Sequence, residues 1–90
     1  MTKAEIVKQI ARETGVEATT AATVVEAFME QVRGALAAKE NVYLRGFGSF
    51  IVKHRRAKTA RNITKNTTIV IPEHDIPAFK PAPNFEEAVK

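Results

Sequence analysis

Ninety residues allow one small domain, and a chain of this length buries only a modest core. The hydrophobic content of 44% is ordinary for a globular protein, no apolar run approaches the length of a membrane span, and the N-terminus lacks the apolar stretch of a secretory signal. There is no cysteine, which excludes disulfides and thiolate metal sites and favours a reducing compartment such as the cytosol.

The net charge of +4 is unevenly distributed along the chain. Residues 41–72 contain seven Lys or Arg and no Asp or Glu, whereas the rest of the chain carries the other seven cations and all ten acids. Positive charge that is confined to one segment is typical of a protein that binds a polyanion.

Two helices are predicted in the N-terminal part. Thr2 and Glu5 have the spacing of a capping box, apolar residues follow at helical intervals, and Gly15 is a natural left-handed stop. A second helix begins at about Ala18. Its apolar stripe, within residues 21–36, is wide enough to pack on more than one neighbour.

After Glu40 the hydrophobic period shortens to about two, which predicts strands. The predicted segments are a strand at 41–44, a turn at 45–48, a second strand at 49–56 and a third strand at 67–71. Phe50 and Val52 share one face of the second strand, and Pro72 ends the third. The turn between these two strands is expected at Lys65–Asn66, because Asn tolerates positive φ.

The C-terminal part is rich in proline. Pro72, Pro77, Pro81 and Pro83 are expected to break the chain into an extended segment, and a short helix then runs from about Pro83 to Val89.

A long hairpin at about residues 53–70 would leave few residues for a core. The outer half of such a ribbon has nothing to pack against, and a lone ribbon is marginally stable in water. The apolar face of the second helix, together with Phe47, Phe50 and Phe79, therefore predicts a homodimer that pools two half-cores and presents two arms.

Three stretches resemble the HU/IHF family of bacterial histone-like DNA-binding proteins: Arg45–Phe50 (RGFGSF), the basic run Arg55–Asn62, and Phe79–Pro81. The resemblance extends from Lys3 to Val89. It implies an α+β fold in which two N-terminal helices precede an antiparallel three-stranded β-sheet with a long β-ribbon arm and a short C-terminal helix, assembled as an intertwined dimer. The single domain, 1–90, would then comprise a helical dimerisation base at 1–40, a β-saddle at 41–80 with its arm at about 53–70, and a C-terminal helix at 81–90.

The resemblance also implies the function. Members of this family are architectural proteins that bind the minor groove, insert apolar wedges between base steps and bend the duplex. This chain would bind double-stranded DNA largely without sequence specificity, prefer bent, kinked or gapped duplexes, and compact DNA in the nucleoid. The expected DNA-binding residues are Lys3, Arg45, Gly46, Gly48, Ser49, Lys53, Arg55, Arg56, Lys58, Arg61, Asn62, Ile63, Lys65 and Lys80.

The sequence departs from the family at the arm tip. The family usually has Gly-Arg-Asn-Pro there, with proline as the wedge, whereas this chain has Ala60-Arg61-Asn62-Ile63, so the wedge would be Ile63. Isoleucine lacks the preset φ of proline, which predicts a looser insertion and a smaller kink. Glu86 and Glu87 stand where relatives often have lysines, which predicts a shorter binding footprint.

Other interpretations remain open at this stage. The basic segment is compatible with a solvated charge run, and Ile63 with a cross-strand packing partner. The chain is also compatible with one subunit of a sequence-specific IHF-like heterodimer, or with a protein-interaction module whose arm extends a partner's sheet. Neither His54 nor His74 has paired ligands at metal spacing, and there is no nucleophile–base pair, so we expect surface histidines, no cofactor and no enzyme.

Overall fold

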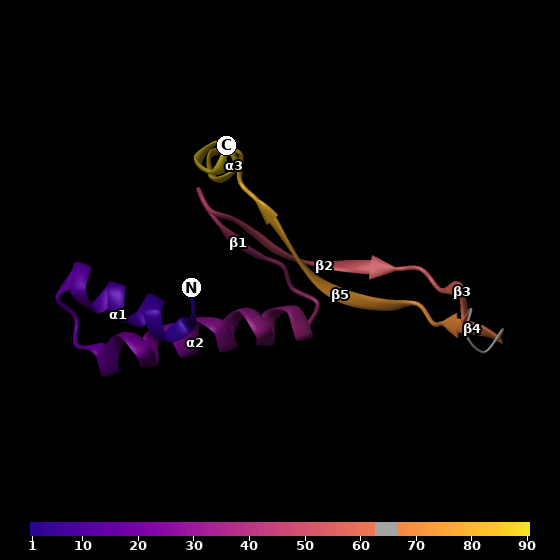
Figure 1. Cartoon of the computed structure of the whole chain (residues 1–90), viewed down its shortest axis with the longest axis horizontal. Coiled ribbons are helices and arrows are strands. Elements are labelled where there is room, and N and C mark those ends of the chain that lie inside the picture. Colours follow the sequence, from indigo (N-terminus) through magenta and orange to yellow (C-terminus); the bar gives the residue numbers. More distant parts are fainter. Residues whose placement is uncertain (63–66) are drawn as a thin grey trace. The chain divides into compact units, whose positions relative to one another are not determined.

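The structure is a computed structural model that describes residues 1–62 and 67–90, and the chain divides into two compact units, Met1–Ala35 and Leu36–Lys90. Figure 1 labels the elements. In chain order they are α1 (Lys3–Thr14), α2 (Ala18–Ala37), β1 (Val42–Leu44), β2 (Gly48–Arg55), β3 (Lys58–Asn62), β4 (Thr67–Ile71), β5 (His74–Pro81) and α3 (Pro83–Val89).

Both predicted ends of α1 are confirmed. The Oγ1 of Thr2 accepts a hydrogen bond from the backbone N–H of Glu5 at 3.3 Å, which satisfies one of the free donors of the first turn. At the other end Gly15 has a φ of +76°, and its N–H donates to the carbonyl of Ala11 at 3.0 Å. These two local signals fix the length of the helix.

The first unit, Met1–Ala35, which we call the helical unit, buries very little apolar surface. Ala21 is 3% exposed and is the only buried hydrophobic residue among those that the structure describes. Val24 and Phe28, on the predicted stripe of α2, are 61% and 46% exposed. Because this apolar face is largely open to solvent in the single chain, it provides surface for a partner.

β1, β2 and β5 form an antiparallel sheet with β2 in the centre. The predicted turn between β1 and β2 is confirmed: the N–H of Phe47 donates to the carbonyl of Leu44 at 3.0 Å, and Gly46 has a φ of +80°. A positive φ at this third position is what a type II turn requires, and glycine adopts it without a steric penalty.

The third strand of this sheet is β5, where the sequence predicted only an extended segment broken by prolines. Pro77 and Pro81 are tolerated because β5 is an edge strand and because both occupy positions of β5 that do not hydrogen-bond to β2. The N–H of Val52, which lies opposite Pro77, points toward β1 and donates to Asn41 Oδ1 at 3.0 Å. The main-chain N–H position and carbonyl of residue 77 therefore point away from β2. For this reason the N–H that proline lacks removes no hydrogen bond from the ladder.

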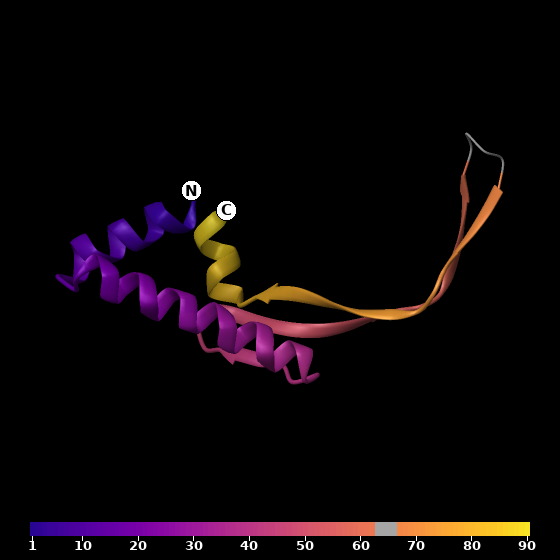
Figure 2. The same cartoon turned by 90° about the horizontal axis from the view of Figure 1, so that it is seen from below.

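The third predicted strand, 67–71, is β4, and it pairs within the predicted arm at about residues 53–70. β4 is antiparallel to β3, and the two form a separate two-stranded sheet, which we call the outer ribbon. The predicted second strand, 49–56, is β2, and β3 lies beyond it within the predicted arm. The hairpin extends back to the pairing of Gly48 with Pro81. Figure 2 shows this hairpin changing direction where the outer ribbon begins. The predicted turn, Lys65–Asn66, lies outside the described residues.

Four phenylalanines make the main apolar cluster of the second unit. Phe47, Phe50, Phe79 and Phe85 have ring centroids 5.0 to 6.0 Å apart in tilted and edge-on arrangements, as aromatic pairs prefer. The predicted final helix is confirmed as α3, with Pro83 in its first turn. Phe47 and Phe79 are still 44% and 39% exposed, so this cluster is also incompletely covered in the single chain.

Candidate nucleic-acid interface

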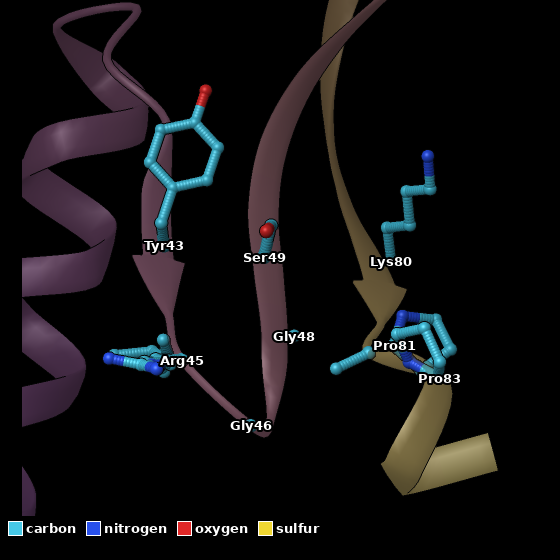
Figure 3. Close-up of a pocket in the computed structure, with 10 residues that line it drawn as sticks. Tyr43, Arg45, Gly46, Gly48, Ser49, Lys80, Pro81 and Pro83 are labelled. Carbon is cyan, nitrogen blue, oxygen red and sulfur yellow. The ribbon is translucent and has the colours of Figure 1, made fainter. Parts of the chain in front are cut away.

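A row of polar side chains crosses the three-stranded sheet. Ser49 lies directly opposite Tyr43 on one side and Lys80 on the other, and residues that are directly opposite project from the same face. Figure 3 shows these three side chains on neighbouring strands, with Arg45 and Gly46 at the adjoining turn. Together with the end of β5 they line a hollow of about 420 Å³. The structure thus brings together five of the residues predicted to bind DNA, since Gly48 also lines this hollow.

Lys53 and Arg55 belong to the same face of the sheet. Side chains alternate along a strand, so both project from the side of β2 that carries Ser49, and both are exposed. Phe50 and Phe79, which are paired across the strands, project from the opposite side. We call the first side the cation face; its members are Ser49, Lys53, Arg55 and Lys80.

The two glycines predicted to offer backbone donors differ in their surroundings. Gly46 is exposed at the turn, whereas Gly48 is buried. A Cβ on Gly48 would lie 2.6 Å from the carbonyl oxygen of Lys80 and 2.6 Å from the ring of Phe79. Close packing between β2 and β5 is therefore sufficient to explain glycine at position 48, and a DNA contact there remains a prediction.

Further cations gather where the sheet meets the outer ribbon. A second hollow, of about 400 Å³, is lined by Arg55, Arg56, Ala57, Lys58, His74 and Ile76. Arg61 follows in β3 and is exposed. Asn62 ends β3, while Ile63 and Lys65 lie outside the described residues. The cations of β2 are therefore followed directly by those at the start of the outer ribbon.

His54 lies at the surface, as the sequence predicted, and it is the centre of a charged network. Its Nδ1 donates to Asp75 at 2.8 Å and its Nε2 to Glu73 at 3.2 Å, and Lys39 Nζ lies 3.0 Å from the other oxygen of Asp75. The hydrogen bonds to Asp75 and Glu73 raise the pKa of His54 above its usual value. Those from His54 and Lys39 lower the pKa of Asp75.

Sequence reasoning missed this network because its members are far apart along the chain. His54 and Asp75 become neighbours only through the β2–β5 register, which pairs them directly. The signal that could have found them was the opposite charge of two residues at equal distances from the centre of the hairpin. Their side chains project from the side of the sheet opposite the cation face, so the acids do not neutralise it.

Lys3 belongs to the helical unit and is already paired. Its ammonium forms an ion pair with Glu26 of α2, and both side chains are about half exposed. A phosphate that binds Lys3 must compete with this carboxylate. An exposed pair of this kind is weak, so the competition is easily won by a polyanion.

The remaining expectations concern metals and membranes. In residues 1–62 and 67–90 no cluster of His, Asp or Glu side chains is suited to hold a metal ion. None of the described helices combines the length and the apolar character that crossing a bilayer requires.

Comparison with known proteins agrees with this arrangement. A family model described as "Bacterial DNA-binding protein" matches residues 1–90. DNA-binding protein HRL53 of Rhizobium leguminosarum is 36% identical, with 99% of this chain and 98% of the relative covered. DNA-binding protein HU of Thermus thermophilus is 38% identical, with 100% of this chain and 93% of the relative covered.

Solved structures of similar proteins share the fold. The Anabaena HU–DNA cocrystal structure superimposes with a TM-score of 0.94 at 35% identity, covering 99% of this chain and 97% of that one. HU from Thermotoga maritima gives a TM-score of 0.71 at 26% identity, with both chains fully covered. The family model spans every residue, so the chain belongs to the HU/IHF family of bacterial DNA-binding proteins, which are architectural proteins rather than enzymes.

Proposed function

We propose that this protein is a histone-like homodimer that binds duplex DNA through the minor groove, largely without sequence specificity, and bends and compacts it in the cytoplasmic nucleoid. The observation that carries the proposal is the succession of cations along the hairpin: Lys53 and Arg55 project from the cation face, and Arg55 shares a hollow with Arg56 and Lys58 where the outer ribbon begins. Backbone phosphates are the ligand that such a strip of Lys and Arg fits.

The dimer is supported by the apolar surface that the single chain leaves open. Ala21 is the only buried hydrophobic residue in the described part of the chain, while Phe28 of one unit and Phe47 of the other remain nearly half exposed. A second copy that covers such faces would supply the core that each chain lacks. Each dimer would then present two basic hairpins.

Within the hairpin we assign the residues two kinds of contact. Most of them would hold phosphates: Arg45, Gly46, Gly48, Ser49, Lys53, Arg55, Arg56, Lys58, Lys65 and Lys80. Lys3, in the helical unit, would also hold a phosphate after release from Glu26. Arg61 and Asn62 would reach minor-groove acceptors, whose pattern separates mainly A·T from G·C pairs. This limited code is the reason for weak sequence preference.

Ile63 would act as the wedge. Burial of an isoleucine gains about 1.5–3 kcal/mol, while unstacking one base step costs a few kcal/mol, so the wedge alone roughly breaks even. Bending the duplex costs on the order of 1–6 kcal/mol more. The phosphate contacts of the cations must therefore supply the difference. The Anabaena HU–DNA cocrystal structure, whose chain has a similar fold, supports DNA as the ligand.

Binding measured against salt, together with a bend assay on short circularised duplexes, tests the function. We expect affinity to fall by about 0.9 log units per contacted phosphate for each log unit of salt, and circularisation to increase in the presence of the protein. An affinity that stays flat between about 50 and 200 mM salt would rule out phosphate-dominated binding. If the purified chain stayed monomeric and failed to bind DNA, a subunit of an IHF-like heterodimer would be the better assignment.

A further inference from the structure

The hairpin is interrupted between the sheet and the outer ribbon. Four residues, Arg56 and Ala57 on one strand and Pro72 and Glu73 on the other, belong to neither ladder; we call them the junction. The register does not change across it. Lys53 pairs with Ile76 and Lys58 with Ile71, an equal advance on both strands, so no inserted residue causes the break.

The hydrogen-bond pattern of the sheet locates the cause. The N–H of Val52 is turned toward β1, where Asn41 accepts it, so the alternation of an antiparallel ladder turns its odd-numbered neighbours in β2 toward β5. Their partners are the even-numbered residues of β5, which exchange hydrogen bonds, while odd-numbered positions such as Pro77 do not. If the same alternation continues, Pro72 falls opposite Ala57 at a position that must exchange hydrogen bonds.

Pro72 forms neither of the two main-chain hydrogen bonds that a regular ladder would place between it and Ala57. Proline has no N–H, so the carbonyl of Ala57 receives no bond from it. The carbonyl of Pro72, which would accept from Ala57 in a regular ladder, accepts from His74 Nδ1 at 3.0 Å instead. Pro72 thus interrupts the ladder, whereas Pro77, in the same hairpin, costs no ladder hydrogen bond.

We propose that Pro72, assisted by His74, makes the junction a hinge that positions the outer ribbon on DNA; this inference rests on the proposed function. Figure 2 shows the hairpin changing direction at this place. Two sets of cations meet there, since Arg55 ends the sheet strand and Lys58 begins the outer ribbon, and both line the hollow of about 400 Å³. Rotation at the junction changes the distance between these cations, and it lets the ribbon follow a duplex that bends away from the sheet.

A proline-to-alanine pair tests the hinge in the free protein. Pro72→Ala restores an N–H at a bonded position, and Pro77→Ala, the matched control, restores one at an unbonded position. Both substitutions increase the conformational entropy of the unfolded chain by a similar amount. The difference between the two variants therefore reports the hydrogen bond in the ladder. By hydrogen exchange, we expect the new amide at position 72 to exchange roughly tenfold more slowly than the one at 77, the scale of one net hydrogen bond.

The same variants test the consequence for DNA. Pro72→Ala should bind a nicked or kinked duplex several-fold more weakly than Pro77→Ala and bend it less, while the two should bind a straight duplex about equally. His74→Ala, which frees the Pro72 carbonyl for Ala57, should shift binding in the same direction by a smaller factor. NMR relaxation should show the outer ribbon of Pro72→Ala moving less relative to the sheet than that of Pro77→Ala.

Two results would overturn the hinge. One is equally fast exchange at positions 72 and 77, which would mean that the ladder stays open without the proline. The other is equal binding and bending of nicked DNA by both variants although the amide at 72 is protected. Failure of the proposed function is recognisable separately, because the wild-type protein would then bend no DNA at all, whereas the exchange measurement on the free protein still decides whether Pro72 opens the ladder.

Discussion

The three-stranded sheet and the outer ribbon belong to one hairpin with one register, yet their surroundings differ. In the sheet, Phe50 and Phe79 pack on each other on one face, which leaves the other face for cations. In the outer ribbon, Ile69 and Val70 lie on alternate faces and are 47% and 70% exposed. Stability of the sheet comes from packing within the protein, whereas the outer ribbon has no packed face of its own and gains one only from a ligand.

This difference separates the roles of the two regions in binding. The sheet holds its cations at fixed spacing, and in the proposed function it serves as a preformed phosphate-binding surface. The outer ribbon carries apolar and basic side chains that adapt to a duplex at an ordering cost. Variants that change one of the two regions therefore show whether the other is affected.

The largest effect is expected from removing charge in the outer ribbon. The double variant Lys58→Gln/Arg61→Gln should weaken binding by on the order of 3 kcal/mol at low salt, because each lost charge-assisted hydrogen bond is worth at least about 1.5 kcal/mol. The salt slope should fall by about 2, which a titration series across salt concentrations measures. Unfolding of the free protein should change little.

The matched control for this variant lies in the helical unit. Lys8→Gln/Arg12→Gln removes the same charge from exposed positions of α1 that are not among the proposed contacts. If the control weakened binding and reduced the slope as much as the ribbon variant did, net charge rather than the hairpin would govern affinity.

The sheet is tested by adding a methyl group to Gly48. A Cβ there would lie 2.6 Å from the backbone oxygen of Lys80, so β2 and β5 must separate to accommodate it. We expect Gly48→Ala to lower the free energy of unfolding by about 1–3 kcal/mol, the usual cost of overpacking, as measured by urea denaturation. Gly34→Ala is the control, since nothing lies within 4 Å of a Cβ at that position, and alanine in a helix should stabilise by about 0.5–1 kcal/mol. Equal stability of both variants would show that β2 and β5 approach less closely.

These two regions also differ in how well the sequence predicted them. The ends of α1 and the turn at Gly46 were found correctly because Thr2, Gly15 and Gly46 act on main-chain groups a few residues away. β5 was missed because whether a proline is tolerated depends on which strand lies beside it. Pro77 and Pro72 look alike in the sequence, and only the pairing shows that one of them costs a hydrogen bond.

The candidate site follows the same rule. The basic residues of the hairpin were recognisable individually from composition and from the family motifs. Their arrangement was not, because Ser49 and Lys80 become neighbours only when β2 pairs with β5. The same long-range pairing places His54, an expected surface residue, at the centre of a charged network that the sequence did not reveal.

The wedge gives a smaller and more selective effect. Ile63→Ala should weaken binding to kinked or gapped duplexes by on the order of 1–2 kcal/mol, the value of the buried side chain that is lost. Binding to a straight duplex should change much less, because no base step is opened there. Parallel titrations of the two duplexes measure the difference. Equal losses on both would mean that residue 63 enters no stack and that the outer ribbon binds only through its charges.

The smallest effect is expected at the base of the hairpin, where His54 bridges Asp75 and Glu73. The pKa of His54 is raised above 6.5, so its stabilising contribution is complete below pH 6.5 and is lost as pH rises through the higher folded-state pKa. The pKa of Asp75 is lowered from 3.8, so its contribution is present above that pH and is lost on further acidification. The network is therefore strongest between these two values.

Thermal unfolding at a series of pH values measures this contribution. Between about pH 5.5 and 8.5, the range in which a histidine titrates, the wild-type Tm should decline more than that of His54→Gln, which keeps hydrogen-bonding capacity but cannot ionise. The difference should be modest because the side chains are exposed to solvent. DNA binding by the outer ribbon should follow the same curve in both proteins, since the carboxylates lie on the side of the sheet opposite the cation face. A pH profile of DNA affinity that His54→Gln abolished would instead mean that the network controls the hairpin, and the sheet and the outer ribbon would then have to be treated as one coupled element.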